Sequence, residues 1–168
     1  MMFGRGDPGG VINIVTRRPP LEPTADASVQ GGSFGFRRVQ GSVSSALPAF
    51  EGLAARLSFA AQEDPTFRNF GDRDNSRTFV APAFTWNPSP DTRVSFLGEF
   101  TRVDNQYDEG LVARNGRVPL DDIARYYGAP FPRYNGNANF GLLKVEHDLN
   151  DNITLREVLN AQWGGFNF

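Results

Sequence analysis

The feature that most constrains this chain is an alternation of apolar and polar residues that recurs along most of its length. It is clearest at residues 92–102, where Val94, Phe96 and Phe100 share one face and charged or hydroxyl side chains share the other. A period of two residues is typical of a β-strand with one apolar face. Seven such segments occur, at 24–32, 36–46, 53–62, 77–87, 92–102, 140–149 and 153–163.

The lengths of these segments and of their connections indicate a membrane barrel. A strand of about 9 to 11 residues crosses a bilayer when tilted, and outer-membrane barrels have short turns on one side and long loops on the other. We therefore predict an all-β fold, a partial antiparallel transmembrane β-barrel of seven strands. The first connection, 33–35, is short, although it lies on the side of the barrel where long loops are expected. The other connections alternate, short at 48–52, 88–91 and 150–152 and long at 63–76 and 104–139.

Two observations keep an alternative open. Glu157 lies on the predicted apolar face of the last segment, where a carboxylate is costly at mid-membrane. Alternating strands also build soluble β-sandwiches, such as a carbohydrate-binding module whose aromatic side chains stack on sugars. The 36-residue connection 104–139 is easier to accept as a binding loop than as a linker in a compact domain.

Composition excludes several functional classes. The chain has no Cys and a single His, so it lacks the residues for a catalytic triad or a thiolate metal site. That histidine, His147, falls on the apolar face beside a turn. A net charge of -2 argues against a general nucleic-acid binder. No apolar run reaches the length of about 18 residues that a transmembrane helix needs. We predict that the chain is not an enzyme and holds no cofactor or metal of its own.

Glycines near the N-terminus have the spacing of a dinucleotide-binding loop, at Gly4, Gly6 and Gly9. That motif requires a helix directly after it, because the helix N-terminus holds the pyrophosphate. Here the β-branched run VINIVT (11–16) follows, which favours a strand. The glycines are better explained by a tight turn that leads into a strand.

The same stretch, FGRGDPGGVINIVTRRP (3–19), resembles the segment that ends the plug domain of TonB-dependent outer-membrane receptors. Further along, GSFGFRR (32–38), FVAPAFTWNPSPDT (79–92), GLVARNGRVP (110–119) and VEHDLNDNITLR (145–156) resemble the first barrel strands of the siderophore-receptor branch, close to the ferrichrome or hydroxamate type. The motif residues that match are Gly4, Arg5, Gly6, Pro8, Gly9, Gly10 and Asn13.

This resemblance implies two parts, residues 1–19 as the C-terminal end of a plug domain and residues 20–168 as the N-terminal part of a truncated barrel. The family's barrel has about 22 strands, so we expect this chain to be a fragment whose open edges make it aggregate when expressed alone. The implied function is TonB-dependent uptake of ferric siderophores across the outer membrane of a Gram-negative bacterium. The implied partners are a ferric siderophore, the TonB complex and outer-membrane lipid, with iron present only as the chelated ligand. Vitamin B12, haem or a glycan remains an alternative ligand.

Within this frame the polar strand faces, with Arg56, Arg93, Glu99 and Arg156, are expected to line the lumen and meet the plug. The long loop 104–139 is the predicted ligand contact, because aromatic and arginine side chains suit a bulky, often anionic chelate. The candidate residues there are Tyr107, Arg114, Arg117, Tyr126, Tyr127, Phe131 and Tyr134, together with Arg125 and Arg133.

Overall fold

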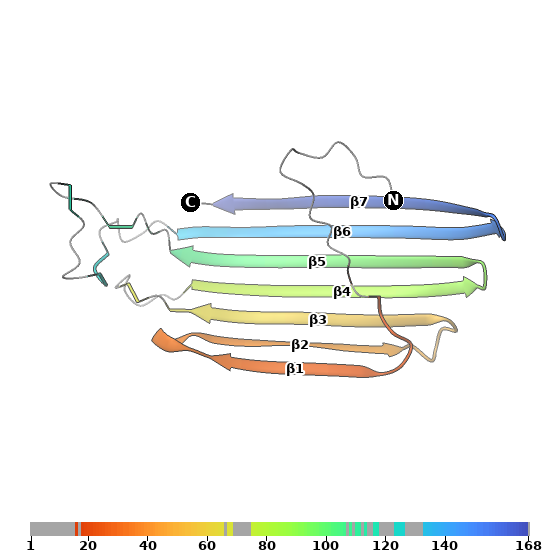
Figure 1. Cartoon of the computed structure of the whole chain (residues 1–168), viewed down its shortest axis with the longest axis horizontal. Helices are drawn as coiled ribbons and strands as arrows, with labels where there is room; N and C mark the ends of the chain where they lie inside the picture. Colours follow the sequence, from red (N-terminus) through yellow and green to blue (C-terminus); the bar gives the residue numbers. More distant parts are fainter. Residues whose placement is uncertain are drawn as a thin grey trace.

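A single antiparallel sheet makes up the fold, in which every strand pairs with its neighbours in the sequence (Figure 1). The computed structural model describes residues 16, 18–65, 67–68, 75–106, 108, 110–111, 113, 116–117, 123–126 and 133–167. The seven strands are β1 (Thr24–Gly31), β2 (Arg37–Ala46), β3 (Leu53–Asp64), β4 (Asn75–Ser89), β5 (Thr92–Gln106), β6 (Arg133–Asn150) and β7 (Ile153–Asn167). The predicted all-β, seven-stranded antiparallel fold is confirmed.

Connections of different length lie at opposite ends of the sheet. The turns 47–52, 90–91 and 151–152 lie at one end, called here the short-turn end, on the right of Figure 1. Connections 32–36, 65–74 and 107–132 lie at the other, called the loop end. The first of these contains the 3-10 turn Ser33–Gly35, in which Phe34 has a φ of 60° and Gly35 a φ of 83°. The alternation of short and long connections that was predicted from the second strand onward is confirmed, and the first connection is the short exception that the sequence also indicates.

Several strands are longer than the sequence pattern predicts, and they extend toward the loop end. β6 begins at Arg133 instead of residue 140, and β5 continues to Gln106 instead of residue 102. The prediction that the long loop spans 104–139 is therefore wrong at both of its ends. Backbone pairing requires no apolar side chain, so the ladder continues after the apolar pattern has stopped.

The pairing register divides the side chains between two faces, because residues directly opposite each other in adjacent strands point the same way. One face, called the Leu57 face, includes Leu57 with its partners Val43 and Pro82, and also Phe84 and Phe96, whose rings stack at 5.1 Å. The opposite face, called the Arg56 face, includes Arg56 with its partners Ser44 and Ala83. Large apolar residues concentrate on the first face, as the alternation predicts.

This sheet has no second layer and hence no core among the described residues. The buried hydrophobic residues there are Ala54, Ala81 and Ala83, while Val29 is 82% exposed and Leu155 is 60% exposed. A β-sandwich needs a second sheet packed on the apolar face of the first, and the described strands form one sheet only. The sandwich alternative therefore does not fit these residues. No helix in the described part of the chain has the length and apolarity to cross a membrane.

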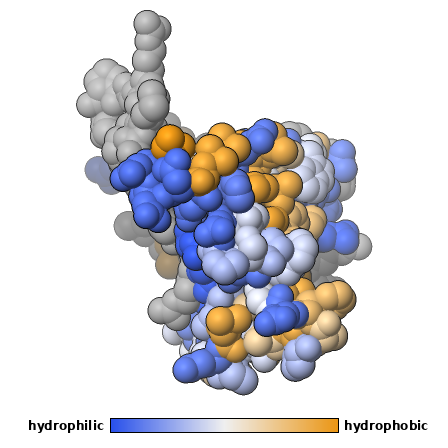
Figure 2. Space-filling model, turned by 90° about the vertical axis from the view of Figure 1, so that its right-hand side faces the viewer, coloured by the Kyte–Doolittle hydropathy of each residue, from blue (hydrophilic) through white to orange (hydrophobic). Residues whose placement is uncertain are grey.

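On the Leu57 face the side chains change character along the strands. Toward the short-turn end they form an apolar band, which ends at Phe100 on β5 and at Trp163 on β7; these two rings meet edge to face at 6.2 Å. Hydrophobic side chains reach the short-turn end itself, beside hydrophilic ones (Figure 2). Toward the loop end the same face carries a polar collar. The collar comprises Arg37, Glu63, Ser76, Arg102, Asp104, Arg133, Asn135 and Asn137.

Candidate functional site

Polar groups on the Arg56 face are joined across strands. Arg56 on β3 donates from Nη2 to Ser42 Oγ on β2 at 2.7 Å, and the same nitrogen lies 3.9 Å from Asp26 Oδ1 on β1. Ser42 in turn donates to Asp26. Because the Arg56 side chain is only 18% exposed, its charge needs these partners. The network links three strands on one face.

A second cluster surrounds Glu146 on β6. Its carboxylate accepts from Arg156 Nε at 3.0 Å and lies 2.8 Å from Lys144 Nζ, and its side chain is 13% exposed. Arg18, which precedes β1, brings its Nη2 to 3.6 Å from Glu146 Oε2. Three cations thus share one carboxylate, and the chain before β1 is held against the Arg56 face at β6. It then reaches β1 past Ala46, whose N–H donates to Leu21 O at 3.2 Å.

The pairing register places Arg56, Arg93, Glu99 and Arg156 on one face, as the sequence predicts. Arg93 pairs with Glu146, which also pairs with Arg156, and Glu99 pairs with Phe140 on the same side of β6. His147 lies on the Leu57 face, where its Nδ1 is 2.9 Å from Thr92 Oγ1 near the short-turn end. That position agrees with the sequence prediction. Within the described part of the chain no three Asp, Glu, His or Cys side chains gather as a metal site would require.

The loop end of the Arg56 face forms a rim with hydrogen-bonding groups from four strands, β2 to β5. Arg38 donates from Nη1 to Gln62 Oε1 at 2.8 Å and from Nε to Gln40 Oε1 at 2.9 Å. Gln62 pairs with both Arg38 and Arg77, so the two arginines flank it. Beside them lies a depression of about 310 Å³. The polar residues that line this loop-end rim include Gln62, Asp64, Asn75, Arg77 and Asn105.

The other side of the rim is aromatic. Tyr134 at the start of β6 stacks on Phe166 of β7, with ring centroids 5.0 Å apart and an interplanar angle of 21°. Tyr134 pairs with Asn105 of the depression. The rim therefore presents guanidinium and amide groups over β2 to β5 and stacked rings over β6 and β7. Such a combination can hydrogen-bond to and stack against a large polar ligand.

The structure separates the predicted ligand residues. Tyr134 lies on the rim, but in a strand and not in the loop where it was expected. Arg133 also lies in β6, and it faces the collar, where its Nη2 is 2.8 Å from Asp104 Oδ1. Arg117, Arg125 and Tyr126 belong to the described part of the long connection. Outside the described residues lie Tyr107, Arg114, Tyr127 and Phe131, and the motif residues Gly4, Arg5, Gly6, Pro8, Gly9, Gly10 and Asn13.

Sequence reasoning missed most of the rim. Arg38, Arg77 and Asn75 belong to different strands, and only the register brings them to one edge. Asn105 and Phe166 lie beyond the ends of the predicted strands. No signal in the sequence identifies them, because polar strand ends lack the apolar alternation and because pairing between strands cannot be read from one strand alone.

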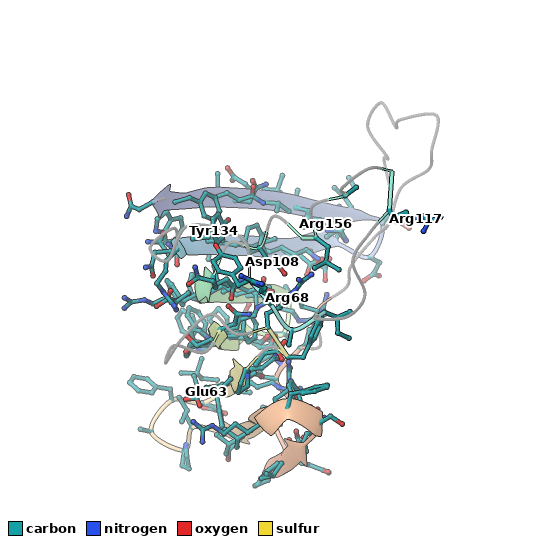
Figure 3. The ribbon with its side chains drawn as sticks, turned by 90° about the vertical axis from the view of Figure 1, so that its left-hand side faces the viewer. Glu63, Arg68, Asp108, Arg117, Tyr134 and Arg156 are labelled. Atoms are coloured by element: carbon teal, nitrogen blue, oxygen red, sulfur yellow. The ribbon has the colours of Figure 1, made fainter. Side chains whose placement is uncertain are left out.

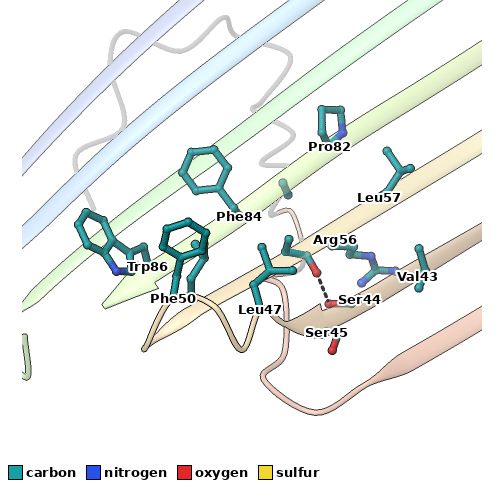
Figure 4. Close-up of a pocket in the computed structure, with 13 residues that line it drawn as sticks. Val43, Ser44, Ser45, Leu47, Phe50, Arg56, Leu57, Pro82, Phe84 and Trp86 are labelled. Atoms are coloured by element: carbon teal, nitrogen blue, oxygen red, sulfur yellow. Dashed lines mark hydrogen bonds between the residues drawn. The ribbon is translucent and has the colours of Figure 1, made fainter. Parts of the chain in front are cut away.

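A larger depression lies elsewhere and differs in character. It has a volume of about 710 Å³ and lies mainly on the Leu57 face near the short-turn end (Figure 4). Its walls include Leu47, Phe50, Leu57, Phe84 and Trp86. Polar atoms contribute little to it; Ser44 at its edge already donates to Ala55 O at 3.0 Å. An apolar groove on the apolar band suits hydrocarbon better than a polar ligand, so the loop-end rim is the candidate functional site.

Comparison with known proteins gives a consistent picture. No protein-family model matches the chain. It is 32% identical over 162 residues to the metal-pseudopaline receptor CntO of Pseudomonas aeruginosa, covering 96% of this chain and 21% of that protein. It is 27% identical over 165 residues to the ferrichrome outer membrane transporter/phage receptor of Escherichia coli, covering 95% and 22%. These relatives are transporters and receptors, not enzymes.

Solved structures agree. The ferric-catecholate import receptor Fiu of Escherichia coli superposes with a TM-score of 0.76 at 25% identity, over 96% of this chain and 24% of that one. The siderophore receptor PiuA of Acinetobacter baumannii, at 19% identity and a TM-score of 0.71, supports the fold alone. The chain spans about a fifth of the curated relatives it matches. The predicted resemblance, fold class and outer-membrane localisation are confirmed.

Proposed function

We propose that this chain, a homologue of one segment of the TonB-dependent siderophore receptors, forms part of the wall of an outer-membrane barrel that takes up ferric siderophores. In this arrangement the Leu57 face contacts lipid, the Arg56 face lines the lumen, and the loop end is extracellular. Residues 1–19 form the end of the plug and residues 20–168 the wall. Energy for release of the ligand comes from TonB.

The observation that carries the proposal is the division of one single-layer sheet into two unlike faces. Large apolar side chains such as Val29, at 82% exposure, and Leu155, at 60%, have no protein layer over them. Apolar surface of this extent is stable only against an apolar medium. Lipid would cover the apolar side chains of the Leu57 face, and a closed barrel would enclose the polar Arg56 face. Closure would also leave no strand edge with unpaired backbone groups.

The Arg18 contact supports the division into plug and wall. Arg18 lies within 3.6 Å of Glu146 on the Arg56 face, so the chain entering the sheet approaches from the side that would enclose a plug. The chain that connects a plug domain in the lumen to the barrel has to leave the lumen beside the first strand. The position of Arg18 and the Leu21 contact with Ala46 near the short-turn end agree with an exit on the periplasmic side.

The rim supports an anionic chelate as the ligand. Arg38 and Arg77 supply charge-assisted hydrogen bonds, and Tyr134 offers a ring already held by Phe166. Iron would enter already chelated, so the wall needs no metal ligands of its own. The long-loop candidates Tyr107, Arg114, Arg117, Tyr126, Tyr127 and Phe131 remain proposed contacts beyond this rim.

Uptake of radioactive iron tests the proposal. The full-length protein is expressed in a strain without its own siderophore receptors, and cells receive iron as ferrichrome, as a catecholate complex or as a metal-pseudopaline complex. We expect uptake of at least one complex, abolished when tonB is deleted. Uptake of vitamin B12 or haem and of none of the three complexes would contradict the siderophore assignment. An Arg38→Ala, Arg77→Ala double variant should raise the KM, while Arg102→Ala on the collar should not.

A further inference from the structure

The two longer connections at the loop end are joined by one arginine. Arg68, in connection 65–74, places its Nε 3.1 Å from Asp108 Oδ2 and donates from Nη1 to the carbonyl oxygen of Arg125 at 3.2 Å; both partners belong to connection 107–132. The Arg68 side chain is 10% exposed and that of Asp108 is 33% exposed. Arg68 and Asp108 lie side by side at the loop end, and Arg117 lies well away from them (Figure 3).

Asp108 is oriented for this contact by its own turn. Its Oδ1 accepts from the N–H of Gly110 at 2.8 Å, and Gly110 has a φ of 84°, a conformation that glycine adopts without strain. One carboxylate oxygen is therefore used within the turn, and the other is left to face Arg68. A carboxylate fixed in this way loses less entropy when it forms the ion pair.

The third loop-end connection reaches the same place. Arg68 lies over the ring of Phe67, with the guanidinium carbon 5.4 Å from the centroid, and the Phe67 ring is 6.0 Å from the ring of Phe34. Phe34 belongs to the turn Ser33–Gly35 and has a positive φ, which is costly for a residue with a side chain. Contacts from Phe34 through Phe67 and Arg68 to Asp108 therefore run across all three connections.

We propose that Arg68 is a positioning residue that clasps connection 107–132, through Asp108 and Arg125, to connection 65–74 and thereby restrains the proposed ligand-contact segment. The inference rests on the proposed function, because it assigns Arg68 a role in siderophore affinity without contact to the siderophore. A guanidinium can engage a carboxylate and a backbone carbonyl together through its planar fork of donors. Its low exposure protects the ion pair from screening by salt. A loop held before binding costs less entropy when the ligand arrives.

Hydrogen–deuterium exchange on the full-length protein in lipid nanodiscs tests the clasp directly. We expect Arg68→Ala to speed amide exchange in peptides covering 108–126 by about 10- to 100-fold, since a hydrogen bond to a charged group is lost together with its ion pair. Asp108→Asn keeps a side-chain oxygen for Gly110 and removes the charge, so it should give a smaller increase in the same peptides. Arg102→Ala removes an equal charge from the collar and is the matched control.

The second readout is the KM for uptake of whichever ferric siderophore the wild-type protein transports. Arg68→Ala should raise the KM about tenfold or more with little change in maximal rate, and Arg68→Lys should fall between, because Lys keeps the charge but not the planar fork. Exchange equal in Arg68→Ala and Arg102→Ala would overturn the clasp, and faster exchange with unchanged KM would overturn its role in affinity. Absence of uptake by the wild type would refute the proposed function, and the exchange comparison would still decide the clasp.

Discussion

The apolar band and the polar collar are two regions of the same face, built on the same strands. Both have continuous antiparallel pairing, from Phe96 with Leu143 in the band to Arg102 with Asn137 in the collar. Only the side chains differ. Pairing satisfies the backbone in either medium, whereas lipid excludes charged side chains. The sheet and the apolar band therefore end at different places, and the boundary between band and collar marks the proposed edge of the membrane.

The largest expected effect comes from placing a collar residue in the band. Leu57 is central in the apolar row of β3, between Ala55 and Phe59. We expect Leu57→Arg to destabilise the full-length barrel by about 2–4 kcal/mol, the cost of an arginine at the bilayer midplane. Urea titration of the barrel refolded into liposomes measures the change in the free energy of unfolding.

The matched control places the same charge in the collar. Asn137→Arg should cost no more than about 1 kcal/mol, since charged side chains near the interface are solvated. Equal losses for the two variants would mean that the band does not face lipid. In that case the assignment of the Leu57 face would have to be abandoned.

A smaller effect of opposite sign is expected at Glu157, which breaks the pattern of the band. The register places Glu157 opposite Val145, between Leu155 and Leu159, as the sequence predicts. Glu157→Leu should stabilise the barrel by up to about 2 kcal/mol, because an acidic side chain costs less than arginine in a membrane but more than leucine. Liposome unfolding again measures it. Glu63→Leu in the collar, which removes the partner of Arg37, should not stabilise.

Sequence predicts the band well and the collar poorly, for a physical reason. Apolar side chains at every second position mark both the strand and its face, so the segments around Leu57 and Phe96 could be identified without coordinates. Asn137 and Arg133 continue the same ladder with polar side chains, and a polar run carries no periodic signal that separates strand from loop. The pattern therefore predicts too long a loop and places Arg133 in it, whereas Arg133 begins β6.

The candidate site shows the same limit more strongly. Its basic and aromatic sides depend on register across β2 to β7, which joins Arg38 to Gln62 and stacks Tyr134 on Phe166. No feature of its own strand marks any of these residues as part of a site. The sequence therefore indicated aromatic and arginine side chains at the loop end as a class, and the structure determines which of them share a surface.

At the boundary itself the expected effect is about 1 kcal/mol. Trp163 contacts Phe100 across β6, and its indole lies beside Gly141, 3.7 Å from the position that a Cβ would take there. Trp163→Ala should destabilise the barrel by about 0.5–1.5 kcal/mol through loss of the aromatic pair. Trp163→Phe is the control that keeps a ring and should recover most of the loss. A neutral Trp163→Ala would argue that the boundary lies elsewhere.

The smallest expected effect lies within the collar, at the ion pair of Arg37 with Glu63, whose side chains are 70% and 44% exposed. An exposed pair contributes little because water and salt screen it, so Glu63→Gln should lower the free energy of unfolding by no more than about 1 kcal/mol. The loss should shrink further when the salt concentration rises to about 1 M, where the Debye length falls to about 3 Å. A loss as large as that of Leu57→Arg, unaffected by salt, would place Glu63 in a dry environment. The band would then extend over the collar, and the contrast between the two regions would fail.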